Sequence, residues 1–380
     1  MAKAKTAKPH ILHLHSSFNP GGKEVRSAQL MNAFGSKVEH TVVSGIPDQM
    51  GAAKLVQPKV KVHYPRDFPP LQGKPLPGRL IKLANAMKPF DLVLTYNWGA
   101  MDAVMAHTLL SEAYGLPPLI HHEDGFNEDE ANQLKWTRNW FRRIALGKSS
   151  GLVVPSEQLE EIALTTWMQP IGRVKRFSNG INTGLYQKKP RADALHVVKH
   201  VGERWVGTLA GLRPVKQLPM LVRAFHRLPD NWNLVILGEG PEKDAIQEQA
   251  LALEISHRVH LPGHVADPAK IAGLFDIFAL SSKSEQFPIS VLEAMAAGVP
   301  VAAPDVGDIR SMVSEENGEF IVPPTGEDAL FEALNTLARN EALRRSIGAA
   351  NQAKARAEFD EKVMVDRYRR LYASAMGKTI

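Results

Sequence analysis

Short apolar runs alternate with longer amphipathic stretches along most of the chain. Eleven runs have the length and the residue types of β-strands. We predict these strands at 10–16, 40–45, 91–97, 117–123, 150–156, 173–180, 203–211, 232–240, 257–263, 276–282 and 299–304. Segments with helical spacing lie between them, among them 217–228 and 266–276. This alternation predicts parallel sheets with right-handed crossovers, that is, doubly wound α/β domains.

Two Rossmann-like domains fit this pattern better than one, because eleven strands are more than a single sheet usually contains in a chain of 380 residues. Polar and turn-forming residues cluster at 178–195, where we place the boundary. The expected N-terminal domain covers 1–178 and the expected C-terminal domain covers 179–357. The amphipathic segment 358–380 is predicted to be a helix that packs back on the first domain.

Composition narrows the class of protein. Hydrophobic residues make up 44% and charged residues 23% of the chain, which is typical of a soluble globular protein. The start of the chain is basic but lacks the apolar region of a signal peptide. No apolar run has the ~18–20 residues that span a bilayer. The absence of cysteine excludes disulfides and thiolate metal sites, and a cytoplasmic protein is expected.

Charge is distributed unevenly. The formal net charge is +6, and residues 1–175 hold 21 Lys and Arg against 15 Asp and Glu, while the rest is neutral. A basic first half predicts an acidic partner, either a phosphate-bearing substrate or the inner face of a membrane, and not nucleic acid. The segment 136–148 bears on this choice, because it combines aromatic and cationic residues at helical spacing: Trp136, Trp140, Phe141, Arg138, Arg142 and Arg143. It is either an interfacial helix near anionic lipid or a helix with its aromatics packed inward and its arginines solvated.

One predicted strand, 276–282, leads into a loop and a helix whose residues could bind a ligand. Pro288 suits the first turn of this helix and Gly298 the position just past its end, so the helix is predicted at 288–297. The N-terminus of this helix is a predicted phosphate-binding site, at the sheet edge where α/β domains bind ligands. Glu285 and Glu293 flank this site. Carboxylates beside a diphosphate repel it unless they accept hydroxyl protons, so we expect a hydroxyl-rich ligand. Alternatively, Glu285 only stabilises the helix through a favourable interaction of its charge with the helix dipole, and Glu293 is a solvated residue on the helix surface.

In this region the sequence resembles the retaining glycosyltransferases of family 4, whose motif is E-x7-E followed by a small-residue helix and G-x-P. The matching residues are Glu285, Glu293, Gly298 and Pro300, and Gly307 lies in the family's next turn. The resemblance continues at 235–241, 259–265 and 318–324. It implies the GT-B fold, in which two Rossmann-like domains face each other across a cleft. It also implies transfer of a sugar from a nucleotide-diphosphate sugar with retention of configuration.

The resemblance implies roles for residues of the second half. Glu285 would hold sugar hydroxyls and Glu293 the ribose. Lys216 matches the family lysine that binds the diphosphate; Gly211 stands where the family arginine often stands, and Arg213 follows two residues later. Two cations would make a metal unnecessary. The remaining predicted donor-binding residues are Gly207, Gly238, Gln286, Phe287, Pro288 and Ile289.

The first half matches the family more loosely. Gly21 and Gly22 resemble the family's glycine-rich loop near the acceptor and the donor phosphate. At 121–124 the resemblance aligns His121 with an earlier family histidine and places Asp124 where the sugar-contacting histidine usually stands. Asn97, with Trp98, is predicted to line the acceptor site, although Trp98 alone equally fits ordinary packing.

A zinc site is the competing interpretation of the histidines. His13, His15, His121 and His122 would cluster if their strands are neighbours. Alternation argues against it, because His121 and His122 then point to opposite faces of the sheet. We therefore expect no metal and no cofactor.

The predicted function is glycosyl transfer onto a sugar or a lipid-linked acceptor in polysaccharide or glycolipid assembly. Two alternatives remain: a nucleotide-sugar epimerase on the same architecture, and a non-catalytic protein that binds a nucleotide sugar or a membrane. A dinucleotide oxidoreductase is disfavoured, because 238–241 has no G-x-G-x-x-G.

Overall fold

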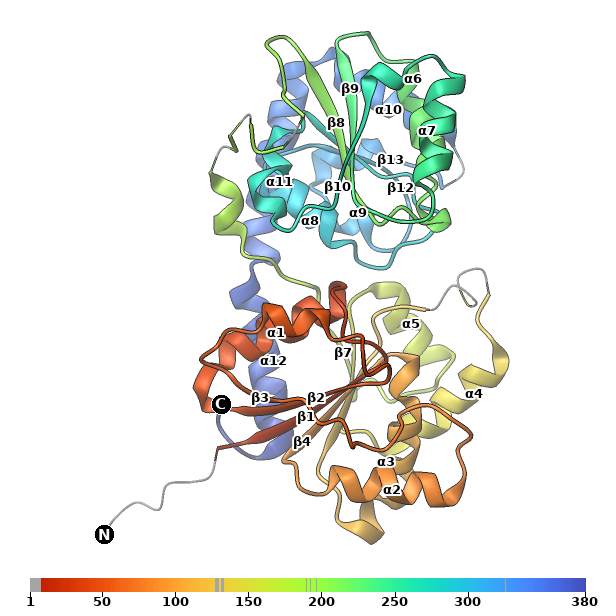
Figure 1. Cartoon of the computed structure of the whole chain (residues 1–380), viewed down its shortest axis with the longest axis vertical. Coiled ribbons are helices and arrows are strands. Elements are labelled where there is room, and N and C mark those ends of the chain that lie inside the picture. The colour runs from red at the N-terminus through yellow and green to blue at the C-terminus, as the bar shows by residue number, and fades with distance from the viewer. Residues whose placement is uncertain are drawn as a thin grey trace, which may run out of the picture. The chain divides into compact units, whose positions relative to one another are not determined.

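The computed structural model describes residues 8–126, 130, 133–188, 190–191, 193–195, 197–324 and 326–380. The chain divides into two compact units. Unit 1 comprises Met1–Ser178 and Met364–Ile380, and unit 2 comprises Asn179–Val363. Each unit is a parallel sheet with helices on both faces (Figure 1). The predicted fold class is confirmed.

The sheet of unit 1 has the strand order β3-β2-β1-β4-β5-β6-β7. Its strands are β1 His10–His15, β2 Glu39–Ser44, β3 Lys61–His63, β4 Leu92–Tyr96, β5 Leu119–His122, β6 Gly151–Val154 and β7 Val174–Arg176. Strand order reverses direction between β1 and β4, which pair from Ile11 with Leu92 to His15 with Tyr96. The carboxyl ends of β1, β4 and β5 therefore meet at one edge.

Both faces of this sheet are buried, as the nearly continuous apolar strands require. The helices are α1 Gly22–Phe34, α2 Pro77–Met87, α3 Met101–Tyr114, α4 Trp136–Ala145 and α5 Glu157–Thr165. Leu12 and Leu14 point to the core shared with α2, α3 and α5, whereas Ile11 points to the opposite core. That second core includes Tyr368 and Tyr372 of α12 (Glu361–Met376), which crosses from unit 2.

The sheet of unit 2 has the order β10-β9-β8-β11-β12-β13. Its strands are β8 Arg204–Leu209, β9 Trp232–Leu237, β10 Val259–Gly263, β11 Ile277–Ala279, β12 Val301–Pro304 and β13 Ile321–Val322. Its helices are α6 Leu218–His226, α7 Lys243–Ala252, α8 Ile289–Ala296, α9 Ile309–Met312, α10 Glu327–Arg339 and α11 Glu341–Glu358. Helices α6, α7 and α10 share one core with the sheet and α8 shares the other.

All eleven predicted strands are present, and β3 and β13 were not predicted. The helical prediction at 266–276 is wrong: the segment forms two short 3₁₀ turns, η9 Pro268–Lys270 and η10 Ala272–Leu274. Gly273 packs there against Pro190, whose ring would lie 2.9 Å from a Cβ at this position. None of the helices in the described part of the chain is long and apolar enough to span a bilayer.

Candidate functional site

A cavity of about 330 Å³ lies at the carboxyl ends of β8, β9 and β10 in unit 2. Its lining residues are Leu209, Ala210, Gly211, Leu237, Gly238, Glu239, His264, Val265 and Pro268. Ligands of open α/β sheets bind at this edge. Gly238 has a φ of 150°, and a Cβ there would lie 1.9 Å from the carbonyl oxygen of Ala210. Only glycine therefore lets these two strand ends approach each other beside the cavity.

Gly207 lies away from this edge, within β8, where it pairs with Val235 and Phe278. A Cβ on Gly207 would lie 2.2 Å from the ring of Phe275. The glycine makes room for a core aromatic ring. Its assignment as a donor-binding residue stays a prediction.

Lys216 and Glu285 meet on two neighbouring loops of unit 2. Lys216 ends the 3₁₀ turn after β8, and Glu285 lies in the loop between β11 and α8. The Lys216 Nζ lies 2.5 Å from Glu285 Oε1, and both side chains are more than four-fifths buried. The Ser282 hydroxyl donates to the same carboxylate oxygen at 2.6 Å, and the Ser281 hydroxyl donates to the Lys216 carbonyl at 2.7 Å. The two loops thus hold a cation and a carboxylate in contact.

Arg213 is exposed, and its side chain has no ion pair or hydrogen bond with the described residues. Its Nε lies 3.5 Å from the place of a Cβ on Gly211. The arginine side chain therefore runs back over Gly211, at the rim of the cavity, three residues before Lys216 in sequence.

The helix after Glu285 is α8, one residue shorter at each end than predicted. Pro288 is its N-cap with an extended backbone, and Ile289 is its first residue. Gln286 accepts at its carbonyl from the amide of Asp308 at 2.9 Å, which fixes the loop. Phe287 is 7% exposed and packs edge-on against the ring of Phe359, with centroids 5.6 Å apart. The Phe287 side chain thus anchors the loop in the core, and the assignment of Phe287 to the donor site stays a prediction.

Glu293 lies within α8, and Tyr186 donates its hydroxyl proton to Glu293 Oε1 at 3.1 Å. Burial raises the pKa of Glu293 to about 7, although the Tyr186 hydrogen bond opposes this shift. The alternative of a solvated glutamate at this position is therefore wrong. Tyr186 lies in the 3₁₀ turn η6 (Thr183–Gln187), and nothing in the sequence pattern pointed to it.

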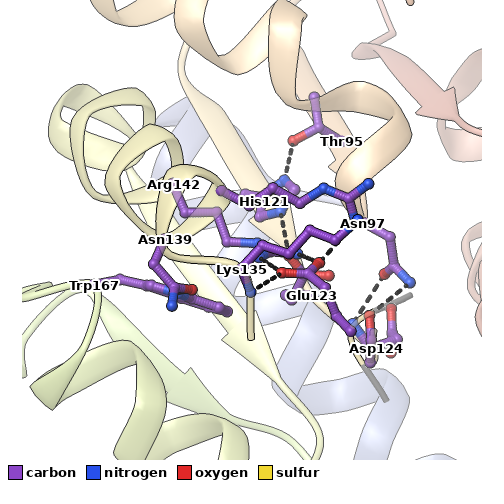
Figure 2. A network of polar contacts seen from close by, with 12 residues as sticks. Thr95, Asn97, His121, Glu123, Asp124, Lys135, Asn139, Arg142 and Trp167 are labelled. Atoms are coloured by element: carbon purple, nitrogen blue, oxygen red, sulfur yellow. Dashed lines mark hydrogen bonds and ion pairs between the residues drawn. The ribbon is translucent and has the colours of Figure 1, made fainter. Parts of the chain in front are cut away.

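In unit 1, Asp124 and Asn97 lie together at the carboxyl ends of β4 and β5 (Figure 2). Asn97 has a φ of 52°, and its Oδ1 accepts from the Asp124 amide at 2.9 Å. Arg26 of α1 binds both oxygens of the Asp124 carboxylate, with Nη2 to Oδ2 at 2.8 Å. Burial pushes the pKa of Asp124 up, but the Arg26 charge outweighs it and the pKa lies below its ordinary value. Asp124 is therefore held as a carboxylate.

His121 is fully buried on the face of the sheet that carries α4. Its Nδ1 lies 2.8 Å from the Thr95 hydroxyl, and its Nε2 lies 3.6 Å from Glu123 Oε2 (Figure 2). Arg142 also reaches Glu123, with Nε donating to Oε2 at 3.1 Å, and both its Nη atoms donate to Glu130. Arg142 is 1% exposed, so its prediction as a lipid-facing or solvated arginine is wrong. The carboxylates of Glu123 and Glu130 replace the water that a buried guanidinium loses.

The histidines do not form the zinc cluster that was considered. His13, His15 and His122 lie on one face of the sheet and His121 on the other. His13 Nε2 lies 3.0 Å from Nδ1 of His40, and His122 Nε2 lies 2.8 Å from the Tyr372 hydroxyl. Among the described residues, no group of three or more His, Asp or Glu side chains is arranged to hold a metal ion.

The glycine loop of unit 1 precedes α1, with Gly21 as N-cap and Gly22 as the first helical residue. A Cβ on Gly21 would lie 2.8 Å from Glu24 Oε2. Glu24 is 3% exposed, pairs with Lys23 at 2.6 Å, and burial raises its pKa. The start of α1 therefore already faces a carboxylate of its own chain, and Arg26 one turn later faces Asp124.

Helix α4 exposes Trp136, Trp140 and Ile144, which are 72%, 52% and 53% exposed. Their spacing of four residues places them on one face. Arg143 lies over the Trp140 ring at 5.0 Å. Phe141, by contrast, packs against Trp98 with centroids 5.5 Å apart. The inward-packing alternative holds for Phe141 and is wrong for the two tryptophans.

The paired α/β units and the strand-end cavity define the class: this is the GT-B fold of glycosyltransferases. The chain superposes on the crystal structure of HepE from Anabaena in complex with UDP with a TM-score of 0.79, covering 96% of this chain and 100% of HepE at 22% identity. HepE has also been crystallised with UDP-glucose. At this identity the likeness establishes the fold.

Residues 197–354, all within unit 2, match the family described as Glycosyl transferases group 1. The chain is 28% identical over 166 residues to the N-acetylgalactosamine-N,N'-diacetylbacillosaminyl-diphospho-undecaprenol 4-alpha-N-acetylgalactosaminyltransferase of Campylobacter jejuni, covering 43% of this chain and 45% of that protein. It is 27% identical over 322 residues to the alpha-maltose-1-phosphate synthase of Mycolicibacterium smegmatis, covering 74% and 82%. The chain thus matches about half the length of the first relative.

Proposed function

We propose that the protein is a retaining glycosyltransferase of family 4 that transfers a hexosyl group from a nucleotide-diphosphate sugar to a sugar or lipid-linked acceptor. The contact between Lys216 and Glu285 carries this proposal. It joins a phosphate-binding cation to a hydroxyl-binding carboxylate beside the start of α8, and these residues belong to the stretch that resembles the family motif. The match of residues 197–354 supports the same assignment.

The charges suit a diphosphate leaving group without a metal. Lys216 and Arg213 would bind the diphosphate oxygens, and the N-terminal amides of α8 would add their partial positive charge. A diphosphate that engages Lys216 weakens the hold of the lysine on Glu285. The carboxylate is then available to accept protons from sugar hydroxyls, while Glu293 does the same for the ribose. Transition-state charge builds on the diphosphate, where these groups stabilise it most.

Retention follows from attack on the same face. The bond from the anomeric carbon to the phosphate oxygen breaks, the bond to the acceptor oxygen forms on that face, and the departing phosphate oxygen takes the acceptor proton. No enzyme carboxylate attacks the sugar, in contrast to retaining glycosidases. This fits Glu285, whose Oε1 is held by Lys216 and Ser282.

Donor turnover without acceptor tests the function. The assay measures nucleoside diphosphate release from UDP-, GDP- and ADP-sugars, with EDTA present in one series. We expect slow release from one donor that EDTA leaves unchanged and that Glu285→Gln and Lys216→Met each lower at least tenfold. The exposed residues Lys243 and Glu316 provide control variants, Lys243→Met and Glu316→Gln.

Three results discriminate the alternatives. Release that both site variants retain contradicts the assignment of the site. Conversion of the donor to another nucleotide sugar identifies an epimerase. Binding of a nucleotide sugar without release, in the presence of candidate sugar and lipid-linked acceptors, identifies a non-catalytic protein.

Helix α4 is the proposed contact with an anionic membrane surface. Its exposed Trp136, Trp140 and Ile144 form an apolar stripe, and Arg143 lies beside it. Tryptophan at the headgroup level with nearby cations is typical of interfacial helices. We expect sedimentation with vesicles containing phosphatidylglycerol and loss of it in Trp136→Gln/Trp140→Gln. Equal sedimentation of the wild type and this variant contradicts the proposal, and Leu109→Gln on α3 is the matched control.

A further inference from the structure

The turn that begins unit 2 reaches the second glutamate of the motif. Thr183 opens η6 and donates its hydroxyl to Asp360 Oδ2 at 2.6 Å, and Ile181 just before it pairs with Asp360 as an isolated bridge. Three residues after Thr183, Tyr186 is 9% exposed and belongs to the core around α8. The turn is thus fixed at its start and buried at Tyr186.

From this fixed turn, the Tyr186 hydroxyl meets the Glu293 carboxylate at 3.1 Å. It engages Oε1, and Oε2 has no hydrogen-bond partner among the described residues. The turn η6 also packs against η9, whose Pro268 lines the cavity at the strand ends. Asp267, next to Pro268, acts on both Tyr186 and Glu293 through its charge. Neither residue lines the cavity itself; the pair is joined to it through the contact of η6 with η9.

We propose that Tyr186 is a positioning residue for the nucleotide: its hydroxyl fixes the rotamer of Glu293 and favours the ionised carboxylate, so that Oε2 accepts a ribose hydroxyl. This inference rests on the proposed function, which places the ribose at Glu293. A phenylalanine would fill the same space but would leave Oε1 of a largely buried carboxylate without its donor.

The protonation state of Glu293 gives this role a distinct signature. Burial raises the pKa of Glu293 to about 7, the Tyr186 hydrogen bond lowers it, and the Asp267 charge raises it. A protonated carboxyl group has one acceptor fewer for a ribose hydroxyl. Removal of the Tyr186 hydroxyl raises the pKa of Glu293 further, so ribose recognition is lost over a wider pH range.

The experiment measures binding of UDP, GDP and ADP from pH 6 to pH 9, and then compares the tightest binder with its 2′,3′-dideoxy analogue. For Tyr186→Phe we expect about tenfold weaker binding at pH 7, typical for a lost hydrogen bond to a carboxylate. The midpoint of the pH profile should move to higher pH. The dideoxy analogue should bind wild type and variant equally. In turnover, the donor KM should rise with kcat nearly unchanged, because the ribose is remote from the reacting bond.

Matched controls separate this role from packing. Tyr114→Phe removes a hydroxyl in unit 1 and should bind as the wild type does. If Tyr186→Phe does not fold, the wild type still tests the premise: an affinity for the ribonucleotide that does not rise through pH 7, or a rise that the dideoxy analogue shares, overturns the proposal.

The outcomes also separate the two proposals. Tight ribonucleotide binding with equal pH profiles for wild type and Tyr186→Phe overturns the role of Tyr186 and leaves the proposed function standing. An equal loss for the ribonucleotide and the dideoxy analogue in Tyr186→Phe also overturns it, because a packing defect does not depend on ribose hydroxyls. No binding of any of the three diphosphates by the wild type overturns both.

Discussion

Acidification should destabilise unit 1 through its buried histidines. Burial, together with the charge of Arg26, lowers the pKa of His122 to about 3, and burial lowers that of His40 to about 3. In the unfolded chain both titrate near 6.5. A histidine with a lowered pKa contributes stability above pH 6.5 that is lost as the pH falls, because the unfolded state then binds the proton. Burial lowers the pKa of His13 and His15 in the same direction.

The magnitude follows from the size of the shifts. A pH of 5 lies 1.5 units below the pKa of a histidine in the unfolded chain. At about 1.36 kcal/mol per unit, protonation of the unfolded state therefore lowers the free energy of unfolding by about 2 kcal/mol for each residue. His40 and His122 together therefore remove about 4 kcal/mol from the free energy of unfolding between pH 7.5 and pH 5. This loss is a large part of the free energy of unfolding of a typical domain, which is roughly 5–15 kcal/mol.

The assay is urea unfolding followed by pulsed hydrogen exchange and mass spectrometry, which reports the two units separately. His122→Gln should reduce the loss between pH 7.5 and pH 5 by about 2 kcal/mol, since glutamine does not titrate. His63→Gln, at an exposed histidine of β3, should leave the loss unchanged. An identical pH dependence in the wild type and His122→Gln would refute the reasoning.

Three further predictions concern buried groups. Glu293→Gln should stabilise unit 2 at pH 8 by about 3 kcal/mol, because the unfolded carboxyl group ionises above pH 4.5 whereas the folded one keeps its proton up to about pH 7. The gain should therefore grow between these two values and vanish near pH 4.5, which urea unfolding at pH 8 and pH 4.5 checks. Gly207→Ala should destabilise unit 2 by about 1–3 kcal/mol through the clash with Phe275, and Phe275→Leu should recover part of this in the same unfolding assay. Arg142→Met should cost unit 1 about 3–5 kcal/mol by removing the guanidinium partner of the fully buried Glu123 carboxylate, measured by thermal and urea unfolding.

Each of these has an outcome that contradicts it. A Glu293→Gln gain that is equal at both pH values means that ionisation is not the cause. A Gly207→Ala protein as stable as the wild type means that the Phe275 ring moves freely. Arg143→Met is the exposed control for Arg142→Met and should change stability by less than about 0.5 kcal/mol; equal effects would contradict the buried network.

The strands could be predicted because their apolar runs are long and both faces of each sheet are covered. β3 and β13 escaped prediction because three and two residues are too few to show a period. The segment 266–276 has apolar residues at helical spacing, but Pro268 and the close packing of Gly273 on Pro190 divide it into turns. Local spacing cannot reveal a contact 83 residues away in sequence.

The site was predictable only where its residues belong to one local pattern. Glu285 and Lys216 stand in stretches that resemble a family motif, and they meet in space. Tyr186 lies 107 residues from Glu293, and Arg26 lies 98 residues from Asp124, so no spacing connects them. Arg142 sits in an amphipathic helix, where an arginine usually faces water. Its burial depends on two carboxylates that only the folded chain brings together.

The order of synthesis has a consequence for unit 1, because its two segments are separated by the whole of unit 2. When residues 1–178 have been made, the core over Ile11 still lacks Tyr368 and Tyr372, and His122 still lacks its hydroxyl partner. A ribosome adding ~5–20 residues per second needs roughly 10–40 s to reach α12. During that time unit 2 is contiguous and free to fold first, while one face of the older sheet stays open. The sheet of unit 1 is thus synthesised before unit 2, but unit 1 can complete its fold only after α12 has been made. Until then, the face of the sheet that α12 covers is exposed and available to a chaperone.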